Sequence, residues 1–150
     1  MTTAARSSVE GDFSLTYPSG WGPAGPVISS AFAAGADCAS ALVVDRALPD
    51  ASGPGAQVLQ SFVQLCWKGT EGLSLDGYMA ATYGGTGGFQ AATLAGRPAF
   101  VAASGGSSTY FVDTSSRRYQ VRTAVTASPE LEAQRRAEVA QVLASLALPD

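Results

Sequence analysis

The segment FQAATLAGRPAFVAASGGSSTYFVDTSSRRYQVRTAV, residues 89–125, decides the fold class of this 150-residue chain. Apolar residues alternate with small or polar ones from Phe89 to Leu94, and a second extended segment runs from Phe100 to Ala103. The residues between them, Ala95-Gly96-Arg97-Pro98, are typical of a turn, because glycine and proline interrupt regular structure. This part of the sequence predicts a β-hairpin.

A second hairpin is predicted directly after the first. Ser108–Asp113 is an extended segment, residues 114–117 predict a turn, and apolar residues alternate with polar ones over Tyr119–Val125. Two hairpins in succession predict an antiparallel meander.

Further strands are predicted in the N-terminal third. Phe13–Tyr17 alternates between apolar and polar residues, and Pro18-Ser19-Gly20 ends that strand. The short apolar runs 27–33 and 41–47 predict a second and a third strand. Two prolines and two glycines within 49–55 predict a loop.

Two amphipathic helices are predicted to pack on this sheet. The first covers 56–67 and ends before Gly69; its apolar stripe consists of Val58, Leu59, Phe62, Leu65 and Cys66. The second covers 129–147, with Ser128 as the N-cap and Pro129 in the first turn; its stripe consists of Leu131, Val139, Val142, Leu143 and Leu146. The segment 73–82 fits either a short helix or irregular structure, and 84–88 predicts a flexible, glycine-rich loop.

The element order predicts an α+β domain with an antiparallel sheet and helices packed on it. A length of 150 residues suits one hydrophobic core, and no domain linker is evident. We expect a flexible N-terminal lead over residues 1–11 and a single domain over 12–150.

Composition excludes several classes of partner. Charged residues make up 14% of the chain and the net charge is -3, which argues against nucleic acid because that affinity requires clustered cations. No run of 18 apolar residues is present, so we expect no transmembrane segment.

The sequence offers no recognisable catalytic machinery. The absence of histidine removes the commonest general base and metal ligand. Lys68 is the only lysine and no serine stands three positions before it. The glycines at 84–88 lack the lysine and the helix that a phosphate loop needs. We therefore expect no enzyme, no catalytic residue, no metal and no cofactor.

Three interpretations of Cys38 and Cys66 remain open from their 28-residue separation. They form a disulfide, they are two buried free thiols, or one of them is reactive or binds metal. The last is disfavoured because no histidine is available as base or co-ligand.

Two groups of residues are candidates for ligand binding. Trp21, Tyr83 and Phe89 are aromatics beside glycine-rich segments, where they either bind a ligand or anchor loops to the core. Arg118 and Arg122 share one face of the last strand, which is either solvated or contacts an anion or a peptide.

Several motifs, taken together, resemble the PsbP-like superfamily. The opening Phe13-Ser-Leu-Thr-Tyr-Pro18 with Trp21 is similar to the first strand of that group, and Leu94-Ala-Gly-Arg-Pro98 is similar to its hairpin turn. The likeness continues at Arg118-Tyr-Gln-Val121 and at Leu143-Ala-Ser-Leu146. It implies an α/β/α sandwich with a twisted antiparallel sheet.

The same resemblance implies a non-enzymatic function. Members include photosystem subunits, a Ran-binding import factor, bacterial lipoproteins of the LpqN type and chaperones of type VI secretion effectors. We expect a bacterial envelope or secreted module that binds a protein or an apolar ligand through a sheet face or a cleft near Trp21. A cytoplasmic chaperone or adaptor is the alternative, and a homodimer is left open. Residues 1–12 lack a signal-peptide pattern and suit either a mature exported chain or a cytoplasmic start.

Overall fold

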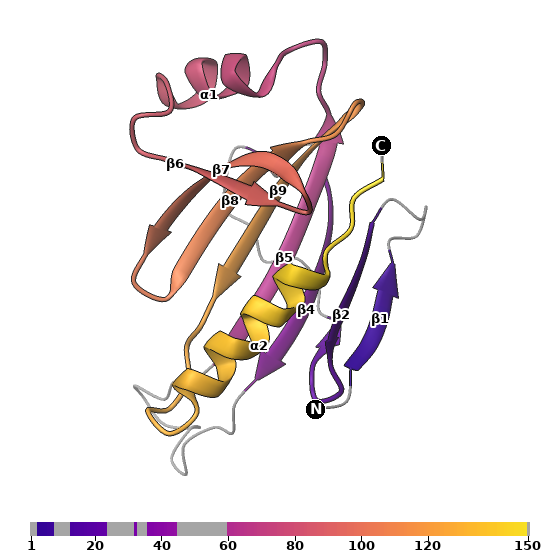
Figure 1. The fold of residues 1–150 in the computed structure, drawn as a ribbon, viewed down its shortest axis with the longest axis vertical. Helices are drawn as coiled ribbons and strands as arrows, with labels where there is room; N and C mark the ends of the chain where they lie inside the picture. The colour runs from indigo at the N-terminus through magenta and orange to yellow at the C-terminus, as the bar shows by residue number, and fades with distance from the viewer. Residues whose placement is uncertain (1–2, 8–12, 24–31, 33–35, 45–59, 150) are drawn as a thin grey trace.

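The structure, a computed structural model, describes residues 3–7, 13–23, 32, 36–44 and 60–149 (Figure 1). The strands are β1 (Thr3–Ser7), β2 (Ser14–Pro18), β3 (Gly22–Pro23), β4 (Asp37–Val44), β5 (Gln60–Gly69), β6 (Gln90–Leu94), β7 (Arg97–Ser104), β8 (Ser107–Asp113) and β9 (Arg117–Ala124). The helices are α1 (Leu75–Tyr83) and α2 (Glu132–Ser145). The predicted α+β class is confirmed.

Seven of these strands form one antiparallel sheet, in the order β3-β4-β5-β9-β8-β7-β6. Both predicted hairpins are present, as β6–β7 and β8–β9. The first turns at Ala95 and Gly96, whose φ angles of 53° and 73° are those of a type I′ turn. Since glycine adopts positive φ without strain, Gly96 suits this turn.

The helix predicted over 56–67 is wrong for its described part, which is strand β5 at the centre of the sheet. β5 pairs with β4 on one side and with β9 on the other. Val63, Leu65 and Trp67 point to one face and Cys66 to the other, and all four are buried. Because both faces are covered, apolar residues fall at consecutive positions and imitate a helical stripe.

The predicted C-terminal helix is confirmed, but it begins at Glu132 and not at 129. The carbonyl of Ser128 accepts hydrogen bonds from the N–H groups of Leu131 and Glu132, so Ser128 opens a turn before the helix and is not its N-cap. Val139 and Val142 of the predicted stripe are buried. They pack with apolar residues of β2, β5, β8 and β9 in the larger hydrophobic core.

The N-terminal strands differ from the prediction in their partners and bounds. β2 pairs with β1, which lies inside the expected flexible lead at 1–11. The strand expected over 41–47 begins earlier, at Asp37; its last positions lie outside the described residues, as do the loop at 49–55 and most of the strand expected over 27–33. Phe32, within that range, is buried.

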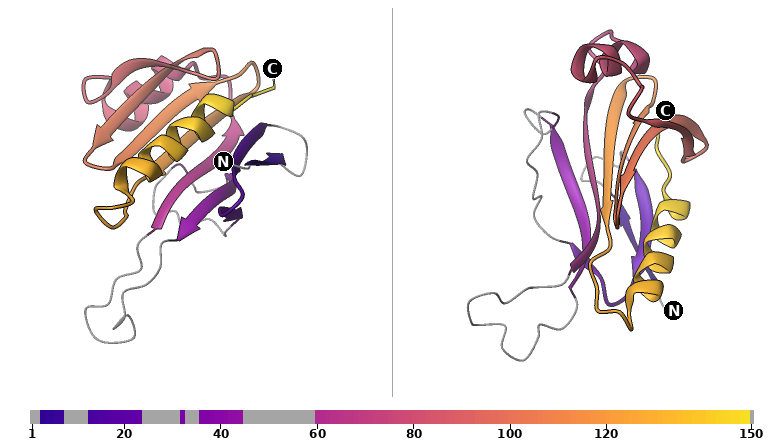
Figure 2. Two further views of the ribbon diagram at one scale, coloured as in Figure 1. Left: turned by 60° about the horizontal axis from the view of Figure 1, so that its bottom comes forward. Right: turned by 90° about the vertical axis from the view of Figure 1, so that its left-hand side faces the viewer.

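The two helices cover different parts of the sheet (Figures 1 and 2). α2 lies along one face, above the larger core, and α1 lies across one end. A smaller core joins Tyr78 and Met79 of α1 to Phe32, Cys66 and Phe111. The short helix that was one of two alternatives for 73–82 is therefore present.

Candidate functional site

The sequence candidates Tyr83 and Phe89 meet in an aromatic surface at the end of α1. Their ring centroids are 5.2 Å apart, and both rings contact Phe111 of β8, at 5.7 Å and 5.9 Å. Tyr83 also contacts Tyr78 at 6.4 Å. We call Tyr83 and Phe89, on their base of Tyr78 and Phe111, the aromatic surface.

Local sequence places α1 and therefore Tyr83. Ser74 is the N-cap, and its hydroxyl accepts a hydrogen bond of 3.0 Å from the N–H of Gly77. Gly84 ends the helix in the left-handed conformation, with φ of 73°, and its N–H donates to the carbonyl of Ala80. Tyr83 thus stands in the last turn, next to the chain reversal that leads to Phe89.

Two cations lie against the rings beneath α1. The Nζ of Lys68 is 4.6 Å from the ring centroid of Phe32 and 5.5 Å from that of Tyr78. The guanidinium of Arg118 is 4.6 Å from the Tyr78 centroid. Cations within about 6 Å of a ring face are attracted by its quadrupole, so both side chains hold α1 on the sheet.

Arg118 is buried, and its guanidinium forms hydrogen bonds with other groups of the same chain. Its guanidinium donates to both carboxylate oxygens of Asp113, at 2.8 Å and 2.7 Å, and to the carbonyl of Leu73 at 2.7 Å. The Leu73 contact joins the loop before α1 to β9. Arg118 is therefore a structural residue, and neither of the two alternatives for it, a solvated position or a contact with an anion or a peptide, is observed.

The other candidate arginine, Arg122, does share the predicted face of β9. It lies opposite Gln64 of β5 and Thr109 of β8, and it is half-buried. Gln64 and Gln120 on the same face are buried, and their side-chain oxygens have no hydrogen-bond partner. The central part of this face is therefore buried and not the solvated surface that was one of the two alternatives.

Tyr83 is prominent because it is exposed. The residue is 47% exposed, and Leu73 at the other end of α1 is 43% exposed, whereas other described large hydrophobic residues are buried or half-buried. Desolvation, with a smaller effect of Tyr78, raises the pKa of Tyr83 above 10.0. The neutral phenol offers an apolar ring and a hydrogen-bonding hydroxyl, a combination common at interfaces.

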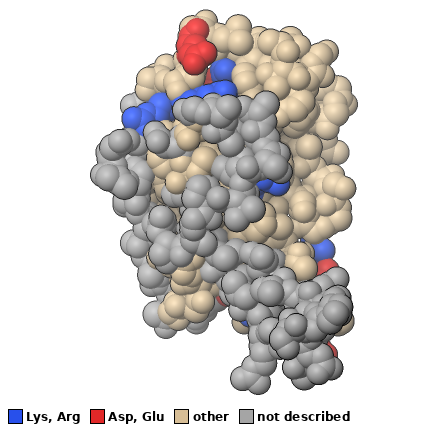
Figure 3. Space-filling model, turned by 180° about the vertical axis from the view of Figure 1, so that it is seen from behind, with Lys and Arg blue, Asp and Glu red and all other residues tan. Residues whose placement is uncertain are grey.

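The surface around α1 carries few charged side chains (Figure 3). Phe100 of β7 and Leu75 are partly buried and pack against the same smaller core as Phe89. The geometry therefore suits apolar and hydrogen-bonding contacts and not recognition of a charged ligand.

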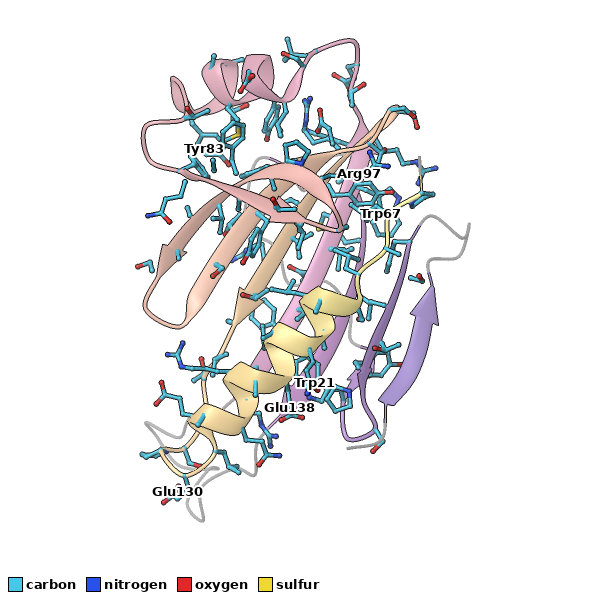
Figure 4. All side chains as sticks on the ribbon, viewed as in Figure 1. Trp21, Trp67, Tyr83, Arg97, Glu130 and Glu138 are labelled. Carbon is cyan, nitrogen blue, oxygen red and sulfur yellow. A yellow bond between two sulfur atoms is a disulfide. The ribbon has the colours of Figure 1, made fainter. Side chains whose placement is uncertain are left out.

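The structure does not bring Trp21 to the other two candidate aromatics. Trp21 is buried in the larger core, and its Nε1 donates to the Glu138 carboxylate at 3.2 Å. Glu138 also pairs with Arg135 at 2.6 Å. Figure 4 shows Trp21 beside Glu138 and α2, far from Tyr83. Trp21 thus anchors the core, the other interpretation left open by the sequence.

Cys38 and Cys66 form a disulfide between directly paired positions of β4 and β5. This decides between the three interpretations left open by the sequence. Cys66 is buried in the smaller core against the residues that support α1. The cross-link therefore fixes β4 to the part of the sheet on which the aromatic surface rests.

Among the residues that the structure describes, no group of three or more potential metal-ligating side chains occurs. In the same part of the chain, neither helix has the length and apolar character needed to cross a membrane.

No protein-family model matches the sequence, and no curated protein matches it. A solved structure with some likeness is that of LpqN of Mycobacterium tuberculosis, described as involved in cell envelope biogenesis. The identity is 12% and the TM-score 0.44, over 99% of this chain and 91% of LpqN. Membership of the PsbP-like superfamily stays a prediction.

Proposed function

We propose that this chain is a non-enzymatic binding module that holds a protein segment or an apolar ligand on the aromatic surface. The observation that carries the proposal is the exposure of Tyr83, a large ring in edge-to-face contact with Phe89 and in tilted contact with Phe111. Tyrosine in such a supported position loses little conformational entropy on binding and is frequent among residues that dominate interface energy.

A role outside catalysis is supported by the residues available for chemistry. The chain has no histidine, and its single lysine packs over Phe32 and Tyr78. Burial raises the pKa of Tyr83, whereas a tyrosine that acts as a general base needs a lowered pKa.

We further propose an extracytoplasmic location, as an envelope or secreted module. Disulfides persist in oxidising compartments and are rare in the cytosol, so the Cys38–Cys66 bond supports this location over a cytoplasmic chaperone. Titration of free thiols in the unfolded protein, prepared without reductant, tests it. Two reactive thiols would favour the cytoplasmic alternative.

Selection of peptides tests the binding function itself. A displayed library of random seven-residue peptides is selected on the purified chain, and the affinity of selected peptides is measured by calorimetry. Replacement Tyr83→Ala is expected to weaken binding at least tenfold, while Tyr83→Phe keeps the ring and most of the affinity. Arg136→Ala, on the exposed side of α2, is the control. Equal affinities for the chain and Tyr83→Ala would refute the proposal.

A further inference from the structure

The outer edge of β6 differs from the edges at β1, β2 and β3. β3, at the opposite end of the seven-stranded sheet, has two residues and includes Pro23. β2 is covered on one side by β1 and on the other by the chain after α2, where Ser14 and Ala147 pair. β1 carries Arg6. Short strands, prolines and charges are the features with which proteins block unwanted strand pairing.

β6 has none of these protections. Its sequence Gln90-Ala-Ala-Thr-Leu94 contains no charged residue and no proline. β6 is the edge strand at one end of the seven-stranded sheet. Gln90, Ala91 and Thr93 are exposed. An exposed, uncharged edge is a template for another strand.

The register shows which backbone groups face outward. Leu94 and Arg97 flank the two-residue turn and form a hydrogen-bonded pair, and such pairs alternate along an antiparallel ladder. Ala91 and Thr93 therefore fall at the positions whose N–H and C=O groups point away from β7. Among the described residues, neither has a backbone hydrogen bond outside its own hairpin. Two donors and two acceptors are thus available along this edge.

This edge continues the aromatic surface. Phe89 directly precedes β6, and Ala91 pairs with Phe100, which pairs with Phe111. Because side chains alternate along a strand, Phe89, Ala91 and Thr93 share the face that carries Phe111. A strand added to β6 would bring every second side chain to this face, beside Tyr83.

We infer that β6 accepts an extended segment of a protein partner by β-strand addition, with an apolar side chain of that segment held against Tyr83 and Phe89. This inference rests on the proposed function and names its partner class. The small side chains of Ala91 and Thr93 leave the edge accessible to an incoming backbone. A second copy of this chain is a poorer occupant, because stable dimers bury about 1,200 Å² or more and β6 has five residues.

Matched substitutions at Ala91 test the inference with peptides selected from the same library. Ala91→Pro removes the outward N–H without removing a β6–β7 hydrogen bond, whereas Ala91→Val keeps the N–H. We expect Ala91→Pro to weaken peptide binding at least tenfold and Ala91→Val to leave it within about threefold, in line with the usual strength of hydrogen bonds left unpaired. Circular dichroism confirms that both variants are folded.

A second measurement needs no protein variant. Methylation of alternate backbone nitrogens of a selected peptide removes the donors that would face β6, and shifting the methyl groups by one residue is the control. Strand addition is supported if only one of the two methylation patterns abolishes binding. Equal binding of the two methylated peptides, or no effect of Ala91→Pro on binding, overturns the inference of strand addition.

The outcomes separate this inference from the proposed function. If Tyr83→Ala weakens binding but Ala91→Pro does not, strand addition is wrong and the aromatic surface still binds. Failure to select any peptide counts against both. A dimer in sedimentation that Ala91→Pro abolishes would assign the edge to a second copy of this chain and overturn the partner class.

Discussion

Replacement of Arg118 by methionine tests how α1 is held on the sheet. Arg118 is 2% exposed, and the change removes its two hydrogen bonds to Asp113 and the one to the Leu73 carbonyl, while the apolar part of the side chain remains. Breaking a buried ion pair by removing one partner costs about 3–5 kcal/mol. The Asp113 side chain is 20% exposed and regains some water, so we expect about 3 kcal/mol.

Urea unfolding followed by tryptophan fluorescence measures this loss. The control is Arg136→Met, which breaks a pair with Glu132 whose side chains are 52% and 51% exposed, and it should cost less than about 1 kcal/mol. Adding Asp113→Leu to Arg118→Met should recover part of the stability, because no buried charge is then left without a partner. A cost for Arg118→Met no greater than that of the control would refute the reasoning.

Three further predictions concern the core, the disulfide and the aromatic surface. Trp21→Ala should lower the free energy of unfolding by about 3–5 kcal/mol; a urea titration with a loss below about 1 kcal/mol would place the ring outside the core. Replacing both Cys38 and Cys66 by alanine should cost about 3–4 kcal/mol, from the loop that the bond closes; unchanged thermal unfolding would contradict this. The raised pKa of Tyr83 favours the neutral phenol in the folded state, so stability should fall as the pH rises through that pKa, above 10.0. The fall should be smaller in Tyr83→Phe, and identical profiles would argue against the shift.

Strands whose partners are near in the sequence were predictable. The hairpins in residues 89–125 have turns marked by Ala95-Gly96 and by Thr114-Ser115-Ser116, and their strands alternate because parts of one face are exposed. β5 was mispredicted because its neighbours β4 and β9 cover it on both sides and cores lie on both faces. No local pattern then separates a strand from a helix.

The candidate site was predictable only where it depends on local sequence. Tyr83 and Phe89 stand on either side of one glycine-rich loop, so their grouping could be proposed from the sequence. Phe111, which joins both rings, reaches them through the pairing of β8 with β7 and was missed. Trp21 was wrongly grouped with them because its polar partner, Glu138, lies 117 residues away in the sequence.

The burial of Arg118 also could not be predicted from local sequence. Its position on β9 and the face that it shares with Arg122 were predicted from alternation alone. Its partners Asp113 and Leu73 come from the paired strand β8 and from the loop before α1. Only the tertiary arrangement shows that this guanidinium already donates hydrogen bonds to Asp113 and to the Leu73 carbonyl.

Amide chemical shifts measured by NMR during titration with a selected peptide test the binding surface most directly. We predict that the largest shifts occur at Tyr83, Phe89, Ala91 and Thr93, with the Ala91 and Thr93 amides gaining protection from solvent exchange as hydrogen bonds form. The indole N–H of Trp21, buried against Glu138, should not move. Shifts centred on Trp21, or none near Tyr83 at saturating peptide, would contradict the proposed site.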